Sequence, residues 1–374
     1  MQKVYLVLIM IAQLFFACNK EKTASINYTF EEIKIDNTFN FRFNDRFDLS
    51  HYIPLETNSN SLISTIIKII VTDKIYIQDQ NEKIFIFTLN GKFINKIDFK
   101  GNGPKEYTSI SDFSVKDSLI SILDTNEKKI ITYHLNGDFI KKQKTLLEIL
   151  YIDKIGDYDL WYTGNIGCDL NYDKKSNQFH KLLFSKENRI EAMFSPFKPK
   201  SSGYVYRTQT PFYQYNGINY FIEPINDTIY RIEKNVIEPI YVVDFGKHKR
   251  PENFLEETPP EDVLSTMIKN SYIRAITSFY DFSDIIYFKA YIGKERKHVI
   301  YDKINKQSIM SASITDEKNN IPVKPISYSG EPQYLMSVLT PDDIRESNVY
   351  GLNLKVNEED NPIIFLYKHI ITNR

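Results

Sequence analysis

The same short unit occurs twice in tandem between residues 73 and 143. The first copy reads DKIYIQDQNEKIFIFTLNGKFINKI from Asp73, and the second reads DSLISILDTNEKKIITYHLNGDFIKKQ from Asp117. When the copies are aligned on the Asn-Gly pairs that end at Gly91 and Gly137, they lie 46 positions apart. A repeat period in the forties, built from β-type segments, is typical of one blade of a β-propeller.

Each copy carries the pattern of several short strands. Residues 75–77 and 84–87 are β-branched and aromatic and are bounded by polar residues, as strands are. The Asn-Gly pair predicts a hairpin with a type I′ turn, in which both Asn90 and Gly91 have positive φ. A unit of about four strands has two hydrophobic faces and must stack on neighbouring units to bury them. The chain is therefore predicted to be all-β, with sheets that stack radially into a propeller.

Further units follow the two clear copies and bring the predicted number of blades to six. The third spans residues 149–199, and the fourth includes strands at 204–206, 217–222, 227–232 and 240–246. The fifth has strands at 284–290 and 298–302. The sixth runs from residue 326 to the C-terminus, with a strand at 334–338 and a short capped turn at 340–343.

The two ends of the chain are predicted to meet in one blade. Residues 28–55 favour one or two strands, one of them at 39–43, where Phe alternates with polar residues. A propeller ring is usually completed by strands from both ends, because an open sheet edge invites aggregation. We expect this region to pair with the C-terminal strand at 363–367 and thereby to close the ring.

One helix is predicted to interrupt the β pattern between the fourth and fifth units. The tetrapeptide TPPE at residues 258–261 has the arrangement of a capping box with proline at the start of a helix. Apolar residues follow at helical spacing from Val263 to Ile268. We expect this apolar stripe to pack on the propeller rather than to bind a partner.

The connection between the two copies carries a resemblance to a known family. The residues that carry it are Gly101, Gly103, Pro104, Glu106, Tyr107, Asp112 and Phe113, together with the segment IPLET at 53–57. In these the chain is similar to the six-bladed β-propeller lipoproteins of Bacteroidetes, whose blades resemble NHL repeats. The close likeness covers residues 53–143, and Lys105 stands where NHL units often have a further glycine. The resemblance implies a lipoprotein of the outer membrane, periplasmic or exposed at the surface.

The Gly-rich connection is not predicted to be a phosphate loop. Pro104 removes a backbone donor, and β structure rather than a helix follows. Because buried polar groups need partners, we expect Glu106 to accept hydrogen bonds from backbone amides while Tyr107 packs between blades.

The N-terminus has the pattern of a bacterial lipoprotein signal. Residues 4–17 are apolar apart from Gln13, which suits the core of a signal peptide better than a membrane span. The run ends in LFFAC, which resembles a lipobox with Cys18 as the lipidated residue; an ordinary secretory signal is the alternative. We therefore predict a signal peptide at 1–17, a lipidated cysteine and flexible tether at 18–27, and the propeller at 28–374. Acylation of Cys18 leaves Cys168 as the only free thiol and excludes an intrachain disulfide.

The charge balance excludes one class of partner. Lys and Arg number 47 and Asp and Glu number 48, so the chain lacks the basic excess that binds a nucleic-acid backbone. The partners that the sequence predicts are the membrane, through the lipid anchor, and a glycan, peptide or protein ligand.

No catalytic, metal or cofactor motif emerges from the sequence. The six histidines stand singly, without the spacing of a local metal site. No Gly-x-Ser-x-Gly elbow is present. The acidic pairs at 256–257, 261–262 and 342–343 lie at or beside predicted helix starts, where capping explains them better than acid-base chemistry.

The densest aromatic group, with a cation nearby, gives the candidate ligand site. Its members are Trp161, Tyr162, Tyr204, Tyr206, Tyr213 and Tyr215, with Arg207 as the cation. Of these, Trp161, Tyr204, Tyr206 and Arg207 are the predicted ligand-binding residues. Aromatic faces bind sugar rings, and a propeller mouth is a natural place for them. The alternative for each of these aromatic residues is a place in the core between blades.

Two functions are consistent with these observations. The first is a lipid-anchored binding or scaffolding module for a glycan, peptide or protein partner. The second is a propeller hydrolase or lyase with a metal-assisted site in the central funnel. The sequence favours binding over catalysis, and His and carboxylate side chains converging in the channel would favour the enzyme.

Overall fold

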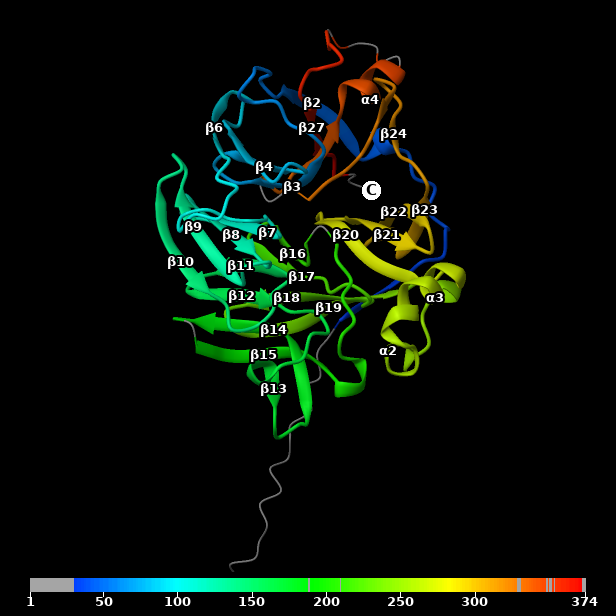
Figure 1. Ribbon diagram of the computed structural model, residues 1–374. Helices are drawn as coiled ribbons and strands as arrows, with labels where there is room; N and C mark the ends of the chain where they lie inside the picture. The colour runs from blue at the N-terminus through cyan, green and yellow to red at the C-terminus, as the bar shows by residue number, and fades with distance from the viewer. Residues whose placement is uncertain are drawn as a thin grey trace, which may run out of the picture.

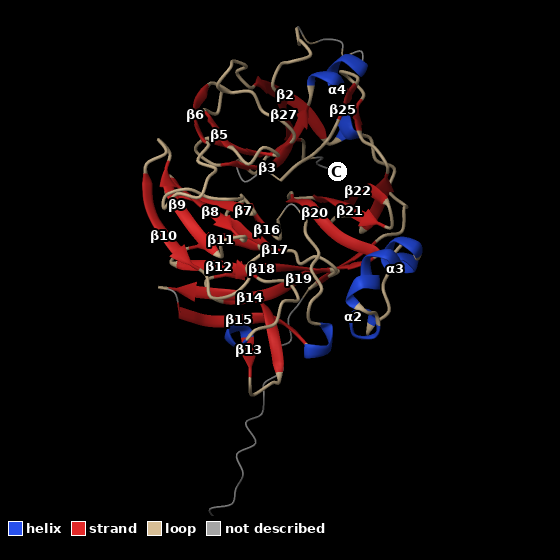
Figure 2. Ribbon diagram, in the orientation of Figure 1, coloured by secondary structure: helices blue, strands red, loops and turns tan. Residues whose placement is uncertain are grey.

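The computed structural model describes residues 30–187, 189–208, 210–327, 331–347, 349, 352 and 354–371. This part of the chain has seven β-sheets, of which six stand around a common axis as blades (Figure 1) and one is a two-stranded ladder. The helices are few and short, and they lie outside the ring of strands (Figure 2). The protein is a six-bladed β-propeller, as the repeat period predicts.

The two sequence copies form the first two blades. Blade one consists of β3 (Ile66–Val71), β4 (Ile75–Asp79), β5 (Ile84–Phe87) and β6 (Phe93–Ile97), and blade two of β7 (Asp112–Lys116), β8 (Leu119–Asp124), β9 (Lys129–His134) and β10 (Phe139–Lys144). Each copy begins at the second strand of its blade. The first strand, which lines the axis, is thus the part of the repeat least visible in sequence.

Blades three to five continue the ring. Blade three has β11 (Tyr151–Ile155), β12 (Tyr158–Tyr162), β13 (Tyr172–Asp173), β14 (Gln178–Lys186) and β15 (Arg189–Phe197), with η2 (Asp169–Asn171) before β13. Blade four has β16 (Phe212–Tyr215), β17 (Ile218–Phe221), β18 (Thr228–Glu233) and β19 (Val236–Asp244). Blade five has β20 (Ile273–Asp281), β21 (Ile285–Ile292), β22 (Glu295–Asp302) and β23 (Gln307–Ser311). The strand predicted at 204–206 is wrong. Tyr204 forms a single bridge to Asn165, and η3 (Pro199–Ser201) precedes it.

Blade six is closed by both ends of the chain, as predicted. β27 (Ile363–His369) pairs with β26 (Tyr334–Leu339) on one side and with β2 (Phe47–Pro54) on the other. On the axial side of β26, Pro325 forms a bridge with Ser337. A small separate ladder of β24 (Thr315–Asp316) and β25 (Ile321–Pro322) lies before β26 in the chain. The ring is therefore joined through hydrogen bonds between the N- and C-terminal strands.

The N-terminal region differs from its prediction in one respect. Residues 39–43 are not a strand, and they lead into η1 (Phe43–Asp45). Their phenylalanines alternate because they pack on the core, where the rings of Phe43 and Phe47 stack at 4.9 Å. The other strand of this region, β1 (Glu31–Lys34), pairs in parallel with β19 as a fifth strand of blade four and not with the C-terminal strand.

The predicted helix is present, but its cap is not. The segment between β19 and β20 contains η4 (Gly246–His248), α2 (Phe254–Glu257), η5 (Pro260–Asp262) and α3 (Val263–Lys269). Thr258 ends α2 instead of capping the next helix, because a 3-10 turn begins at Pro260. Val263 and Met267 are buried with Phe254 and Tyr204, whereas Leu264 is exposed, so only part of this apolar stripe packs on the fold.

The second predicted cap is confirmed. Thr340 Oγ1 accepts a hydrogen bond from the backbone N–H of Asp343, whose carboxylate accepts one from the N–H of Thr340 at 3.0 Å. These two residues form a capping box at the start of α4 (Pro341–Glu346). The acidic pair at this position therefore serves the helix.

The Asn-Gly hairpins differ from the predicted turn type. Gly91 has φ of +82° and Gly137 has φ of +91°, but Asn90 and Asn136 do not have positive φ. Gly91 N–H donates to Thr88 O at 3.0 Å, and Gly137 N–H donates to His134 O at 2.9 Å. This is the three-residue hairpin loop in which a left-handed glycine follows the turn. The type I′ assignment is wrong because the loop is one residue longer.

The core lies between the blades. One cluster joins Tyr76 and Ile86 of blade one to Phe113, Ile131 and Tyr133 of blade two, all of them almost fully buried. Each sheet thus buries a face on the next, which supplies the hydrophobic stabilisation that a single blade lacks.

Glu106 and Tyr107 of the motif that carries the family resemblance make the contacts that the sequence predicts. Glu106 Oε2 accepts a hydrogen bond from Gly103 N–H at 2.7 Å. Tyr107 is fully buried between blades one and two, and its hydroxyl donates to Glu82 O at 2.8 Å. The motif is a structural connection.

Candidate functional site

A polar channel runs along the axis of the ring. Its middle is a cavity of about 110 Å³ to which all six blades contribute. Its lining includes Lys68 of β3, Ser114 of β7, Asp153 of β11, Gln214 of β16 and Phe279 of β20, with Ser327 from the sixth blade. Because the first strands of the blades line this cavity, it is the place where side chains from distant parts of the sequence meet.

The channel wall contains an ion pair and a second carboxyl group. Lys68 Nζ lies 2.7 Å from Asp112 Oδ1 and also donates to Phe113 O at 2.8 Å. Burial raises the pKa of Asp112 even though the ammonium of Lys68 opposes the shift. Burial likewise raises the pKa of Asp153 to about 6.

One end of the channel opens into a cavity of about 380 Å³ that is rich in cations. We call this cavity the cationic mouth; it is lined by Ile66, Ile67, Tyr206, Arg207, Thr208, Thr277, Ser278, Lys289, Tyr291, Arg296 and Ile326. The lining contains three cationic side chains, three hydroxyl-bearing Thr and Ser side chains and no carboxylate. The volume falls within the range of small-molecule pockets.

The charges of the cationic mouth perturb one another. Lys289 is only 8% exposed. Burial first, and then the charges of Arg296 and Lys324, lower the pKa of Lys289 to about 8. The pKa of His298 is lowered to about 4 by its burial and then by Lys289 and Arg296, so the imidazole is neutral at physiological pH. Burial is the larger cause of both pKa shifts, and the neighbouring cations add to it.

The opposite end of the channel is different in charge. A cavity of about 470 Å³ there is lined by Asp73, Asp117 and Asp153 together with Lys116 and Lys154. It lies beyond the end of β3, whereas the cationic mouth lies at the start of that strand. The two ends of the channel therefore differ in charge, and only the cationic mouth has an excess of positive side chains in its lining.

The structure brings together two of the four predicted ligand residues. Tyr206 and Arg207 line the cationic mouth. Trp161 is 5% exposed and packs with Leu123 and Leu183 in the core, and Tyr204 packs on the helical insertion with Phe254. The predicted group of four is therefore not one site, and the alternative of core packing holds for Trp161 and Tyr204.

Sequence reasoning missed the other cations of the mouth. Lys289 stands inside the apolar run IIYFKA of β21, and Arg296 lies on the next strand. A lone lysine within a buried strand was a signal in the sequence, since lysine is almost never buried without a partner.

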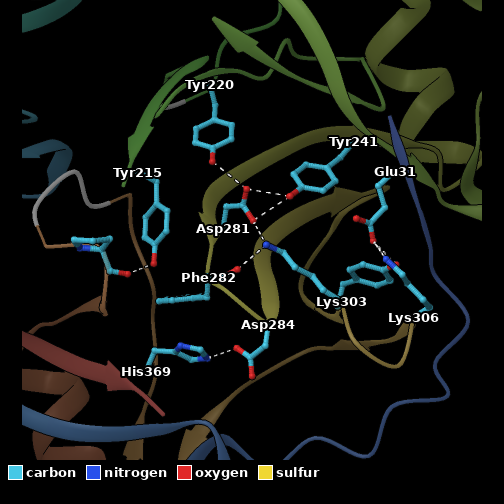
Figure 3. A network of polar contacts seen from close by, with 12 residues as sticks. Glu31, Tyr215, Tyr220, Tyr241, Asp281, Phe282, Asp284, Lys303, Lys306 and His369 are labelled. Atoms are coloured by element: carbon cyan, nitrogen blue, oxygen red, sulfur yellow. Dashed lines mark hydrogen bonds and ion pairs between the residues drawn. The ribbon is translucent and has the colours of Figure 1, made fainter. Parts of the chain in front are cut away.

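A second polar cluster lies between blades four and five (Figure 3). Asp281 Oδ2 accepts hydrogen bonds from the hydroxyls of Tyr220 at 2.9 Å and Tyr241 at 3.1 Å, and its other oxygen pairs with Lys303. Lys303 also donates to Phe282 O at 2.6 Å. The carboxylate is saturated with donors, so the cluster joins the blades and leaves no group free for chemistry.

The same region ties the closing strands to blade five. Arg46, just before β2, pairs with Asp284 at 2.6 Å and with Asp302 at 2.8 Å. His369 at the end of β27 lies 2.8 Å from Asp284. Figure 3 shows the two side chains pointing toward each other. These contacts are interblade anchors.

Neither a metal cluster nor a membrane helix is found in the described part of the chain. No group of three or more His, Cys, Asp or Glu side chains there is arranged to hold a metal ion. Between residues 30 and 371, as far as they are described, no helix has the length and apolarity to span a membrane. The predicted residue Cys18 lies outside the described residues, and Cys168 is a free, partly buried thiol.

The fold and the channel define a six-bladed propeller of the kind that serves as a binding or scaffolding module. The chain belongs to the family described as a domain of unknown function, DUF4934, whose model matches residues 27–368.

The chain is similar to solved structures, and the first of those described next shares its fold. A predicted exported protein from Bacteroides fragilis NCTC 9343 is 19% identical, with a TM-score of 0.75 over 91% of this chain and 100% of that one. A member of the DUF4221 family from Bacteroides vulgatus is 10% identical, with a TM-score of 0.48 over 87% of this chain and 98% of that one. No curated protein matches the chain.

Proposed function

We propose that this protein is a lipid-anchored binding module of the bacterial cell envelope that binds a glycan at the cationic mouth. The observation that carries the proposal is the mouth itself, a cavity of about 380 Å³. Blade five and the loop before blade four supply its hydroxyl, aromatic and cationic side chains, and blades one and six supply isoleucines. A site built from several blades is held rigidly by the ring, as ligand recognition requires.

A glycan is favoured over a peptide or a protein surface by the shape and the lining. A concave cavity of this volume admits one or two sugar units, whereas a protein partner needs a broad face. Thr208, Thr277 and Ser278 offer hydroxyls to pair with those of a sugar. The rings of Tyr206 and Tyr291 supply apolar surface beside them.

Two observations support a location in the cell envelope. The LFFAC sequence that ends at Cys18 follows an apolar core, as in bacterial lipoproteins. The Bacteroides fragilis protein that shares the fold is named as exported. A diacylated cysteine followed by a polar tether would hold the propeller close to the membrane surface.

A thermal-shift screen of the chain from residue 28 onward tests the binding function. Mono- and oligosaccharides, peptides and divalent cations are compared, and we expect saccharides to raise the melting temperature through mass action. Tyr206→Ala and Arg207→Ala are expected to weaken that shift, while Trp161→Phe should not. A shift that only peptides or metal ions produce would count against the glycan.

A further inference from the structure

Lys289 differs from the other buried lysines of the described chain. Lys68 pairs with Asp112 at 2.7 Å, Lys129 lies 3.5 Å from Asp124, and Lys181 pairs with Glu223. Lys289 is equally buried at 8% exposure, yet no carboxylate in the described residues pairs with it. A buried ammonium is costly unless an anion accompanies it, so this position lacks a counterion.

The neighbours of Lys289 do not supply the missing negative charge, and some of them add positive charge. Its register partners are Thr277 on β20 and His298 on β22, both uncharged at neutral pH. Arg207 and Arg296 line the same cavity, and neither forms an ion pair with a described residue. The guanidinium of Arg296 lies 5.0 Å from the centroid of the Tyr291 ring.

Arg274 adds a further cation behind the aromatic lining. Its Nη1 donates to the hydroxyl of Tyr206 at 2.9 Å, and its guanidinium lies 5.7 Å from the centroid of the Tyr291 ring. Its Nε is buried without a hydrogen-bond partner among the described residues. The mouth thus combines several cationic groups with almost no internal compensation.

From this arrangement we infer that the glycan unit bound at the cationic mouth is acidic, with a carboxylate or sulfate held by Lys289 and by the guanidinium groups of Arg207 and Arg296. The inference rests on the proposed function and deepens it by naming the ligand class. Guanidinium groups match the two oxygens of a carboxylate or sulfate, and the ammonium supplies a point charge at the buried end. Thr277 and Ser278 line the mouth beside Lys289 and offer hydroxyls to the sugar ring.

The test compares charged and neutral sugars on three proteins. Binding of glucuronate, glucose 6-sulfate, glucose and inorganic sulfate is measured by calorimetry at matched ionic strength. The proteins are the chain from residue 28 onward, its Lys289→Gln variant and its Lys297→Gln variant. Lys297 lies beside Arg296 on β22, pairs with Glu295 and does not line the mouth, so its variant removes the same charge elsewhere.

We expect the acidic sugars to bind more tightly than glucose, and Lys289→Gln to weaken them about tenfold or more, as the loss of a charged hydrogen bond does. Lys297→Gln should leave their affinity within about twofold, since the charge of Lys297 is paired with Glu295 and does not line the mouth. Folding of both variants is checked by circular dichroism and urea unfolding.

The other outcomes separate this inference from the proposed function. Glucose binding as tightly as glucuronate, with equal affinities in both variants, would overturn the acidic ligand and leave a glycan module in place. Inorganic sulfate binding as tightly as either acidic sugar would overturn the sugar component. Binding of none of the four probes to the wild-type protein would overturn both.

Discussion

Asp112 joins three consecutive blades through the two oxygens of one carboxylate. Its Oδ1 lies 2.7 Å from Lys68 Nζ on the first strand of blade one, and its Oδ2 accepts a hydrogen bond from Ile152 N–H of blade three at 2.9 Å. Asp112 itself is 2% exposed on the first strand of blade two. The contacts that hold neighbouring blades at the channel wall thus depend on one buried charge.

Removal of that carboxylate should destabilise the ring strongly. Asp112→Ala leaves the ammonium of Lys68 buried without a counterion, and breaking a buried pair in this way costs about 3–5 kcal/mol. The double variant Lys68→Met, Asp112→Leu should lose markedly less, because it removes both charges. Urea unfolding midpoints check the order. A double variant as unstable as the single one would contradict this account.

The two Asn-Gly hairpins offer a matched pair of glycine substitutions. A Cβ at Gly91 would lie 2.2 Å from Pro54 O on the closing strand β2, whereas at Gly137 the nearest atom is Cζ of Phe99 at 3.0 Å. Both glycines have positive φ, which costs other residues about 1–2 kcal/mol. Gly137→Ala should therefore cost about that amount, and Gly91→Ala clearly more. Equal shifts in the urea midpoint would show that the contact with Pro54 does not matter.

Stability should depend on the ionisation of Asp153. Because the pKa of Asp153 is raised by burial to about 6, the folded protein holds this proton more tightly than the unfolded chain. The resulting stabilisation is complete below the ordinary pKa near 3.8 and is lost as pH rises through about 6. Asp153→Asn should raise the urea midpoint at neutral pH and change it little at about pH 4. A variant that is less stable than wild type at neutral pH would contradict this sign.

His298 contributes to stability with the opposite pH dependence over a similar pH range. Its pKa is lowered to about 4, so its stabilising contribution is present above its ordinary value near 6.5 and is lost as pH falls through about 4. The two opposing contributions make the wild-type profile alone ambiguous. The difference between wild type and Asp153→Asn isolates the carboxyl group.

The sequence predicts the ring well because a blade is a local unit. The copies at 73–97 and 117–143, the closing strands and the roles of Glu106 and Tyr107 are all confirmed, since each depends on short-range patterning or on the need to cover a sheet edge. The parallel pairing of β1 with β19 was not predictable in this way, because it joins segments about 200 residues apart.

The cationic mouth was only half predictable for the same reason. Tyr206 and Arg207 stand together in sequence, but Lys289 and Arg296 reach the cavity from two strands of blade five. Local spacing does not show which strand faces the axis. Trp161 illustrates the converse error, since aromatic density in sequence does not distinguish a lining side chain from a core one.

Lipidation at Cys18 predicts a specific change in fractionation. Cys18→Ala removes the only residue at the lipobox that can be acylated, so the protein should move from the membrane fraction to the soluble fraction of the envelope. Cys168→Ala is the matched control, since Cys168 is a partly buried thiol within the propeller. Immunoblots of separated membrane and soluble fractions check the outcome. Unchanged membrane association of Cys18→Ala would contradict the anchor.

Ring closure by the terminal strands predicts an unequal effect of two truncations. Removal of residues 362–374 deletes β27, which forms ladders with both β26 and β2 and buries Phe365 and Tyr367 completely. Blade six then loses its middle strand, and the first and fifth blades lose the face that covers them. Because each blade depends on its neighbours to bury its surfaces, we expect the cooperative unfolding transition to disappear.

Removal of residues 1–35 is the comparison. It deletes β1, which among the described strands forms a ladder only with the outer strand β19 of blade four, and leaves the β2–β27 pairing intact. We expect this shorter protein to unfold cooperatively with a modestly lower midpoint, because one edge ladder is lost and no blade is opened. Thermal and urea unfolding followed by circular dichroism distinguish the two truncations. If the protein without residues 362–374 keeps a near-native melting temperature, the N- and C-terminal strands do not hold the ring together.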